Sequence, residues 1–127
     1  MSRVVLDTSA ILALCFSEKG AKLTAAKGKD GVVSAVNYSE AIAKSSDRGI
    51  PVDTVNDALA SLQLTVVPFD HTHAVAAASF RPATRHKDIS FADRACFCTA
   101  ALARLPIMTA VKNWKKLRLG LDIVLIR

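Results

Sequence analysis

Three acidic residues stand where carboxylates are able to act together. Asp7 follows the apolar run in "VVLDTS", Glu40 follows that in "VVSAVNYSE", and Asp93 lies near the start of the helical run "ISFADRACF". Like charges about 6 Å apart at an effective dielectric near 20 repel by roughly 3 kcal/mol. Either one carboxylate stays protonated, or a hard cation such as Mg²⁺ or Mn²⁺ binds them through oxygen. The pattern therefore favours metal-assisted hydrolysis.

Each acid also has an explanation that needs no function. Asp7 suits the N-cap of the helix that follows it, and Ser90 with Asp93 has the S-x-x-D spacing of a capping box. Glu40 and Lys44 have the i,i+4 spacing of a helical ion pair. On the residues alone, both interpretations stay open for all three acids. An aspartyl phosphatase is disfavoured, because Ser9 occupies the position of its second acid.

Basic residues are the second chemical feature of the chain, whose formal net charge is +6. Such runs are most often a solvated face, and their alternative role is to hold nucleic acid. Two groups are present, a dense one in "KNWKKLR" and a looser one around "RPATRHKD". A basic surface beside an acidic metal pocket suits phosphodiester cleavage. The residues expected to contact RNA are Arg85, Lys87, Lys112, Lys115 and Lys116. Trp114, within the dense group, is expected to be a packing residue more than a stacking platform.

Alternating strands and helices must position these side chains. Strands are predicted at 3–7, 32–35, 64–69, 106–110 and 122–127, and helices at 8–16, 18–31, 36–48, 52–63, 70–80 and 90–105. The last helix is apolar nearly all round, so it is expected to be buried. Residues 81–88 are predicted to be a polar loop. Parallel strands need crossover connections, so this order predicts a parallel sheet covered on both faces. Ligands bind at the carboxyl ends of such strands, where the three acids are expected to meet.

Length and composition predict one domain over residues 1–127. The chain is 51% hydrophobic and 22% charged, which is typical of a globular protein. It has neither a membrane-length apolar run nor a signal sequence, so a cytoplasmic protein without membrane contact is expected. The three cysteines, Cys15, Cys96 and Cys98, are expected to be buried thiols and not disulfides or metal ligands.

Several motifs in order resemble those of the PIN-domain family, in particular the VapC toxins of bacterial type II toxin–antitoxin pairs. They are "VVLDTSAILAL", "VNYSEAIAK", "PFDHTHAVAAA", "ISFADRACFCTAALARLPIMTA" and "LGLDIVLIR", and they span essentially the whole chain. The resemblance implies a three-layer α/β/α sandwich around a parallel sheet of about five strands. It also implies an endoribonuclease dependent on Mg²⁺ or Mn²⁺ that cleaves structured RNA such as tRNA or rRNA, a VapB antitoxin that inhibits it, and a homodimer.

The resemblance assigns roles to individual residues. Asp7, Glu40 and Asp93 match the family's first three acids. Asp7 and Asp93 would be the principal metal ligands, while Glu40 would hold metal-bound water or a second metal. Small hydroxyl residues that support the pocket correspond to Thr8, Ser9, Ser90 and Thr109.

One position departs from the family pattern. The motif Thr-x-Asp is replaced here by Thr109, Ala110 and Val111, and a valine offers no oxygen to a hard cation. Either the chain is a natural divergent member, or the acid was exchanged to disarm a toxic nuclease. The leading hypothesis is a ribonuclease toxin weakened by Val111. The alternative is a catalytically silent module that binds RNA or its antitoxin.

Overall fold

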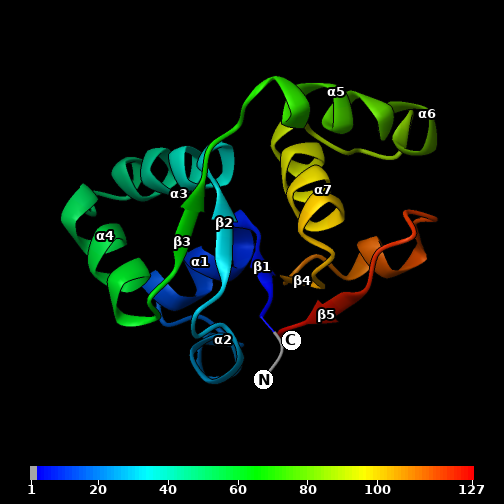
Figure 1. The fold of residues 1–127 in the computed structure, drawn as a ribbon. Helices are drawn as coiled ribbons and strands as arrows, with labels where there is room; N and C mark the ends of the chain where they lie inside the picture. Colours follow the sequence, from blue (N-terminus) through cyan, green and yellow to red (C-terminus); the bar gives the residue numbers. More distant parts are fainter. Residues whose placement is uncertain (1–2) are drawn as a thin grey trace.

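A parallel sheet forms the centre of the computed structural model, which describes residues 3–127 (Figure 1). The strands found in this range are β1 (Val5–Leu6), β2 (Val32–Ser34), β3 (Thr65–Val67), β4 (Ile107–Thr109) and β5 (Ile123–Leu125). Their spatial order is β3-β2-β1-β4-β5, and every neighbouring pair is parallel. The most apolar strands lie in the middle, as expected for a sheet covered on both faces.

Helices provide the crossovers and cover both faces of the sheet (Figure 1). They are α1 (Thr8–Cys15), α2 (Ala21–Lys27), α3 (Ala35–Asp47), α4 (Val52–Ser61), α5 (His71–Ser79), α6 (Arg81–Thr84) and α7 (Phe91–Ala103), and a 3₁₀ helix, η1 (Lys112–Lys116), follows β4. In Figure 1, α1 to α4 lie on one side of the sheet and α5 to α7 on the other. The predicted three-layer α/β/α architecture is confirmed.

Alternation along the strands creates two apolar cores, one on each face. Leu6 of β1 and Met108 of β4 pack with Ile11 of α1 on the first face. Their neighbours Val5 and Ile107 point to the opposite face, where they pack against α7 and η1. Successive strand residues point to opposite faces, so two-residue and three-residue strands suffice to join both layers.

Three details of the sequence prediction are wrong. Residues 81–84 form the short helix α6 instead of a loop, because Pro82 fits the first turn of a helix and the Thr84 hydroxyl donates to the Phe80 carbonyl. Helix α7 is buried through its middle as expected, but Phe91 and Leu102 near its two ends are about half exposed. Cys96 and Cys98 are buried as expected, but Cys15 is only half-buried; all three are free thiols.

The strand order identifies where a ligand would bind. From β1 the chain moves outward to β2 and β3, and then returns through α7 to β4 on the other side of β1. The order therefore reverses between β1 and β4, and clefts at the carboxyl ends of such strands are where open α/β sheets bind ligands. Asp7 follows β1 directly and Thr109 ends β4. No helix among residues 3–127 is long and apolar enough to span a membrane.

Candidate active site

Asp7 is the most buried acid of the site, with 3% of its surface exposed. It is the N-cap of α1, where its Oδ1 accepts hydrogen bonds from the Ala10 amide at 3.0 Å and the Ser9 hydroxyl at 2.7 Å. Its Oδ2 accepts from the Thr109 hydroxyl at 2.8 Å. The capping interpretation is thus confirmed, yet an ordinary N-cap lies at the surface. Enclosure distinguishes Asp7 from a residue that only caps a helix.

Burial changes the acidity of Asp7. It raises the pKa of the carboxyl group from 3.8 to about 6, although the hydrogen bonds from Ser9, Ala10 and Thr109 favour the charged form. The negative charge of Asp93 raises this pKa further. A carboxylate that burial makes costly to ionise gains most from a nearby positive charge, because the cation's charge offsets the cost of removing the ionised group from water. Asp7 is therefore suited to bind a cation.

Backbone amides at the end of β4 hold the hydroxyls that surround Asp7. The Ala110 amide donates to Ser9 Oγ at 2.9 Å, and the Val111 amide donates to Thr109 Oγ1 at 3.0 Å. Each hydroxyl accepts from the backbone and donates to the carboxylate, so its orientation is fixed. The half-buried Val111 side chain packs with the apolar cluster beside α7. Position 111 thus supplies a backbone donor and no metal ligand.

Asp93 also caps a helix. Its Oδ2 accepts from the Ser90 amide at 3.0 Å, while Ser90 Oγ accepts from the Asp93 amide at 3.1 Å, which confirms the predicted capping box. Burial raises the pKa of Asp93 against the effect of the Ser90 hydrogen bonds. The charge of Glu40 raises this pKa and that of Lys44 lowers it. Asp93 therefore lies in the electrostatic field of two charged side chains of α3.

Glu40 lies further out, on the half-buried side of α3. Its Oε2 is 4.0 Å from Lys44 Nζ, so the predicted i,i+4 pair is confirmed. The pair is partly exposed and is expected to contribute little to stability. Because the Glu40 charge also acts on Asp93, the ion pair and a role in the site are compatible.

The three acids are electrostatic neighbours but do not form a closed cage. Among residues 3–127, no three His, Cys, Asp or Glu side chains converge closely enough to hold a metal ion. Of the expected cluster, the charge of Asp93 acts on Asp7, and the charge of Glu40 acts on Asp93. Mg²⁺ is commonly held by one or two carboxylates together with water, so the oxygen donors present fit such an ion. The predicted meeting of all three acids is thus only partly realised.

The predicted RNA-contacting residues are exposed and belong to two segments that border this edge of the sheet. Arg85 and Lys87 precede α7 in the chain, and Lys112, Lys115 and Lys116 belong to η1, which follows β4. Trp114 is 1% exposed and meets Phe97 edge to face, with 4.8 Å between ring centroids. Its predicted packing role is confirmed. Trp114 anchors η1 while the neighbouring lysines face solvent.

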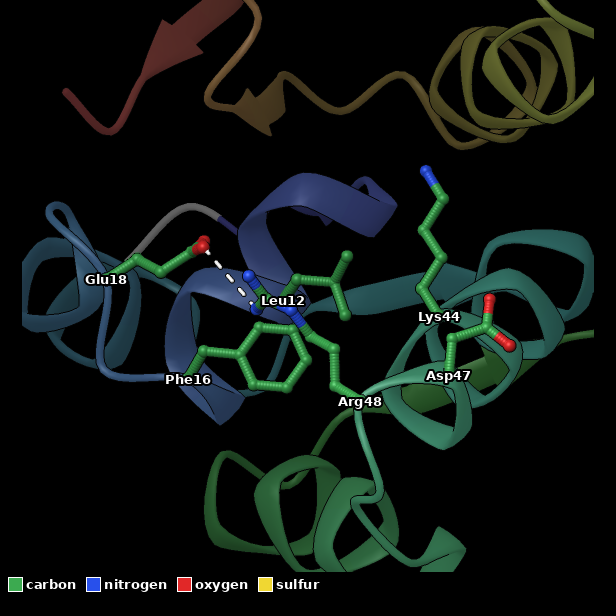
Figure 2. Close-up of a pocket in the computed structure, with 6 residues that line it drawn as sticks. All are labelled: Leu12, Phe16, Glu18, Lys44, Asp47 and Arg48. Atoms are coloured by element: carbon green, nitrogen blue, oxygen red, sulfur yellow. Dashed lines mark ion pairs between the residues drawn. The ribbon is translucent and has the colours of Figure 1, made fainter.

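A hollow that the sequence did not reveal is drawn in Figure 2. It encloses about 300 Å³ between α1 and α3 and is lined by Leu12, Phe16, Glu18, Lys44, Asp47 and Arg48. The Arg48 guanidinium lies 4.1 Å from the centroid of the Phe16 ring, and its Nη1 is 3.9 Å from Glu18 Oε2. Figure 2 shows Arg48 beside the Phe16 ring, with its ion pair to Glu18 as a dashed line. Lys44 belongs to both places, since it lines the hollow and pairs with Glu40.

Asn37 is a buried polar residue that the sequence reasoning did not single out. It is 1% exposed and lies one helical turn before Glu40 on α3. The available signal was its position in the first turn of a helix whose neighbouring residues are mostly apolar. Its side chain bonds to two other helices, across 29 and 55 residues of sequence, which no local pattern indicates.

Comparison with known proteins identifies a family that matches this sequence. A sequence profile described as the PIN domain matches residues 4–118. No curated protein sequence gives a match.

Solved structures with the same fold include several toxin–antitoxin proteins. A toxin–antitoxin complex from Klebsiella pneumoniae superposes with a TM-score of 0.77 at 17% identity and 98% coverage of both chains. DNA-bound VapBC from Salmonella typhimurium gives a TM-score of 0.74 at 15% identity, with full coverage of both chains. The sarcin–ricin loop cleaving toxin VapC20 of Mycobacterium tuberculosis gives 0.68 at 16% identity, covering 85% of this chain and 88% of the other. At these identities the likeness concerns the fold.

Proposed function

Because the chain belongs to the PIN-domain family, we propose that it is an endoribonuclease toxin of the VapC type that cleaves structured RNA such as tRNA or rRNA. The observation that carries this proposal is the enclosed carboxylate of Asp7, which feels the charge of Asp93 and lies at the carboxyl end of β1, where the strand order reverses between β1 and β4. Ordinary helix caps do not require such burial. The sarcin–ricin loop cleaving activity named for one structural neighbour supports RNA as the substrate class.

Mg²⁺ or Mn²⁺ is the proposed cofactor, and Asp7 and Asp93 are the residues that would hold it. Such an ion supplies an activated water and neutralises charge that develops on the phosphate. Ser9 and Thr109 keep the Asp7 oxygens oriented, and Ser90 does so for Asp93. Glu40 is the remaining acid, and it would hold metal-bound water or a second metal. Thr8 completes the support from the first turn of α1.

Exposed cations from two segments of the chain would bind the RNA backbone. Arg85 and Lys87 lie before α7, and the lysines of η1 lie after β4. Phosphate contacts of this kind supply affinity with little sequence information. The RNA would therefore be selected mainly by its shape.

Val111 weakens this site in the proposed function. Asp7 and its supporting hydrogen bonds are in place, whereas position 111 has no oxygen donor. Fewer carboxylates mean lower affinity for a hard cation. We expect RNA binding to survive and both metal affinity and turnover to be lower than with an acid at this position, whether the valine is a natural divergence or an introduced change.

The proposed partners are a VapB-type antitoxin and a second copy of the chain, and the proposed compartment is the cytoplasm. Several structures of the same fold are toxin–antitoxin complexes, which supports an antitoxin that neutralises the toxin.

The test of the enzymatic proposal is restoration of the acid. Val111→Asp protein is incubated with Mn²⁺ and total tRNA and rRNA, and the double variant Val111→Asp/Asp7→Asn serves as the matched control. We expect cleavage by the first protein and none by the second. Intact RNA with both proteins, or equal cleavage by both, would contradict the proposal.

A catalytically silent binding module is the second candidate, and Val111 is the observation that favours it. Calorimetry with Mn²⁺ separates the two proposals. Heat of binding to Val111→Asp, and weaker heat to the parent, supports the nuclease. Absence of heat from both proteins, combined with binding of RNA or of an antitoxin, supports the silent module.

A further inference from the structure

The side-chain amide of Asn37 lies between the three helix ends that carry the acids. Its Nδ2 donates to Thr8 Oγ1 at 3.1 Å and to the Ala92 carbonyl oxygen at 3.1 Å. Thr8 is the residue after Asp7, Ala92 is the residue before Asp93, and Asn37 itself is one turn before Glu40. One buried amide thus connects the immediate neighbourhoods of all three carboxylates.

The orientation of this amide is fixed by its partners. A backbone carbonyl only accepts hydrogen bonds, so Nδ2 must face Ala92 and Oδ1 must point elsewhere. The Thr8 hydroxyl donates to the Asn37 backbone carbonyl at 3.4 Å, which leaves its oxygen free to accept from Nδ2. Both protons of the amide are therefore used, one on α1 and one on α7. Asn37 Oδ1 is buried and accepts no hydrogen bond from the described protein residues.

We propose that Asn37 is a positioning residue, whose amide sets the placement of Asp7, Glu40 and Asp93 relative to one another and thereby the affinity of the site for a divalent cation. The inference about cation affinity rests on the proposed function; the inference about helix placement rests on the hydrogen bonds alone. An apolar side chain of the same size leaves the Ala92 carbonyl with one partner fewer and removes the donor to Thr8 Oγ1, while the bond from the Thr8 hydroxyl to the backbone carbonyl of residue 37 can remain. The helices then keep their apolar contacts but lose the polar connection that fixes their ends.

A second buried polar residue on the same helix shows that burial alone does not create this connection. Ser45 is fully buried on α3, and its hydroxyl has no partner among the described residues. It makes no hydrogen bond to α1 or α7. Of these two buried side chains on α3, only Asn37 bonds to the helices that carry the other acids.

The experiment compares two variants in the Val111→Asp background, where the carboxylate set is complete. Asn37→Leu removes both amide donors without adding charge. Leu59→Ala, in the core between α4 and the sheet, is the control that destabilises the fold away from the acids. Each protein is titrated with Mn²⁺ by calorimetry. Residues that orient metal ligands typically change metal affinity by about 10- to 100-fold, so we expect the Kd to rise at least about tenfold in Asn37→Leu and to stay nearly constant in Leu59→Ala.

Hydrogen exchange gives a measurement that needs no metal. The Ala10 amide donates to Asp7 and the Asp93 amide donates to Ser90, so both report on the helix ends in question. After correction for each variant's change in the free energy of unfolding, we expect these two amides to exchange faster in Asn37→Leu than in the parent. In Leu59→Ala their corrected exchange rates should not change. Equal behaviour of the two variants in exchange, or an unchanged Kd in Asn37→Leu, would overturn the positioning role.

The two proposals can fail separately. If Val111→Asp protein takes up no Mn²⁺, the proposed function fails, and the exchange rates alone decide the role of Asn37. If Asn37→Leu does not fold, Thr8→Val removes the same connection from the α1 side and takes its place in both measurements. When all proteins fold, Thr8→Val and Asn37→Leu should be non-additive, because they break a shared hydrogen bond. Additive effects on Kd would contradict the proposed connection.

Discussion

Thr109 donates a hydrogen bond to Asp7, with 2.8 Å between Thr109 Oγ1 and the carboxylate Oδ2, and so joins the ends of β4 and β1. Thr109 Oγ1 in turn accepts a hydrogen bond from the Val111 amide at 3.0 Å. This contact uses the backbone of residue 111 and is independent of its side chain. The hydrogen bond that orients Asp7 is therefore present although residue 111 is a valine and not an acid.

Replacing Thr109 by valine tests the value of this support. Thr109→Val keeps the shape but removes the donor to a buried carboxylate, so we expect a loss of about 1–3 kcal/mol in the free energy of unfolding near pH 7. The pKa of Asp7 should rise above its value of about 6, because the lost bond favoured the charged form. Urea unfolding and a carboxyl NMR titration measure the two effects. Thr99→Val is the matched control, since Thr99 is equally buried but bonds only to the Ala95 carbonyl. The same pKa for Asp7 in both variants would contradict this account.

Stability without divalent metal should depend on pH through Asp7. Its pKa is about 6 in the folded protein against 3.8 in an unfolded chain, so the folded state binds the proton more tightly. The stabilisation is full below pH 4 and is lost as the pH rises through about 6, by an amount on the order of 3 kcal/mol. Asp93, whose pKa is also raised, contributes in the same direction. In Asp7→Asn protein the decline between pH 4 and 7 should be much smaller. An unchanged profile, measured by urea unfolding in EDTA, would show that Asp7 is not the group that titrates.

Trp114 should be the largest single contributor to stability in the basic segment. It is buried against Phe97, and Trp114→Ala is expected to cost about 3–5 kcal/mol in the free energy of unfolding. Unfolding is followed by far-UV circular dichroism, because the chain has one tryptophan and the variant has none. Trp114→Phe keeps an aromatic ring and should lose less. A loss below 1 kcal/mol in Trp114→Ala would mean that η1 is not anchored in this way.

Lysines of η1 should dominate the salt dependence of RNA binding. In a Lys112→Ala/Lys115→Ala/Lys116→Ala variant, the slope of log K against log salt should decrease by roughly 0.7–0.9 for each phosphate contact that is lost. The measurement is fluorescence anisotropy with labelled tRNA at several salt concentrations. Lys27→Ala/Lys29→Ala is the control, since these residues precede β2 at the opposite edge of the sheet. Equal slopes for the two variants would assign the RNA surface elsewhere.

Local patterns in the sequence predicted the strands, most helices and the capping roles of Asp7 and Asp93, because those features depend on residues at most a few positions apart. The same logic correctly paired Glu40 with Lys44. It did not predict the burial of Asp7, which arises from packing against β4 and α7, nor the bridge made by Asn37. It also missed α6, whose single turn is too short to show a period. These features depend on contacts between distant parts of the chain.

The hydrogen bond between Asp7 and Thr109 spans 102 positions of the sequence. Strand β1 also needs β4 as its neighbour on that side of the sheet. A chain growing on the ribosome therefore has its first acid from the outset, but obtains the partner that orients it only after most of the protein has been made. The pocket around Asp7 is assembled late in synthesis, so incomplete chains lack it.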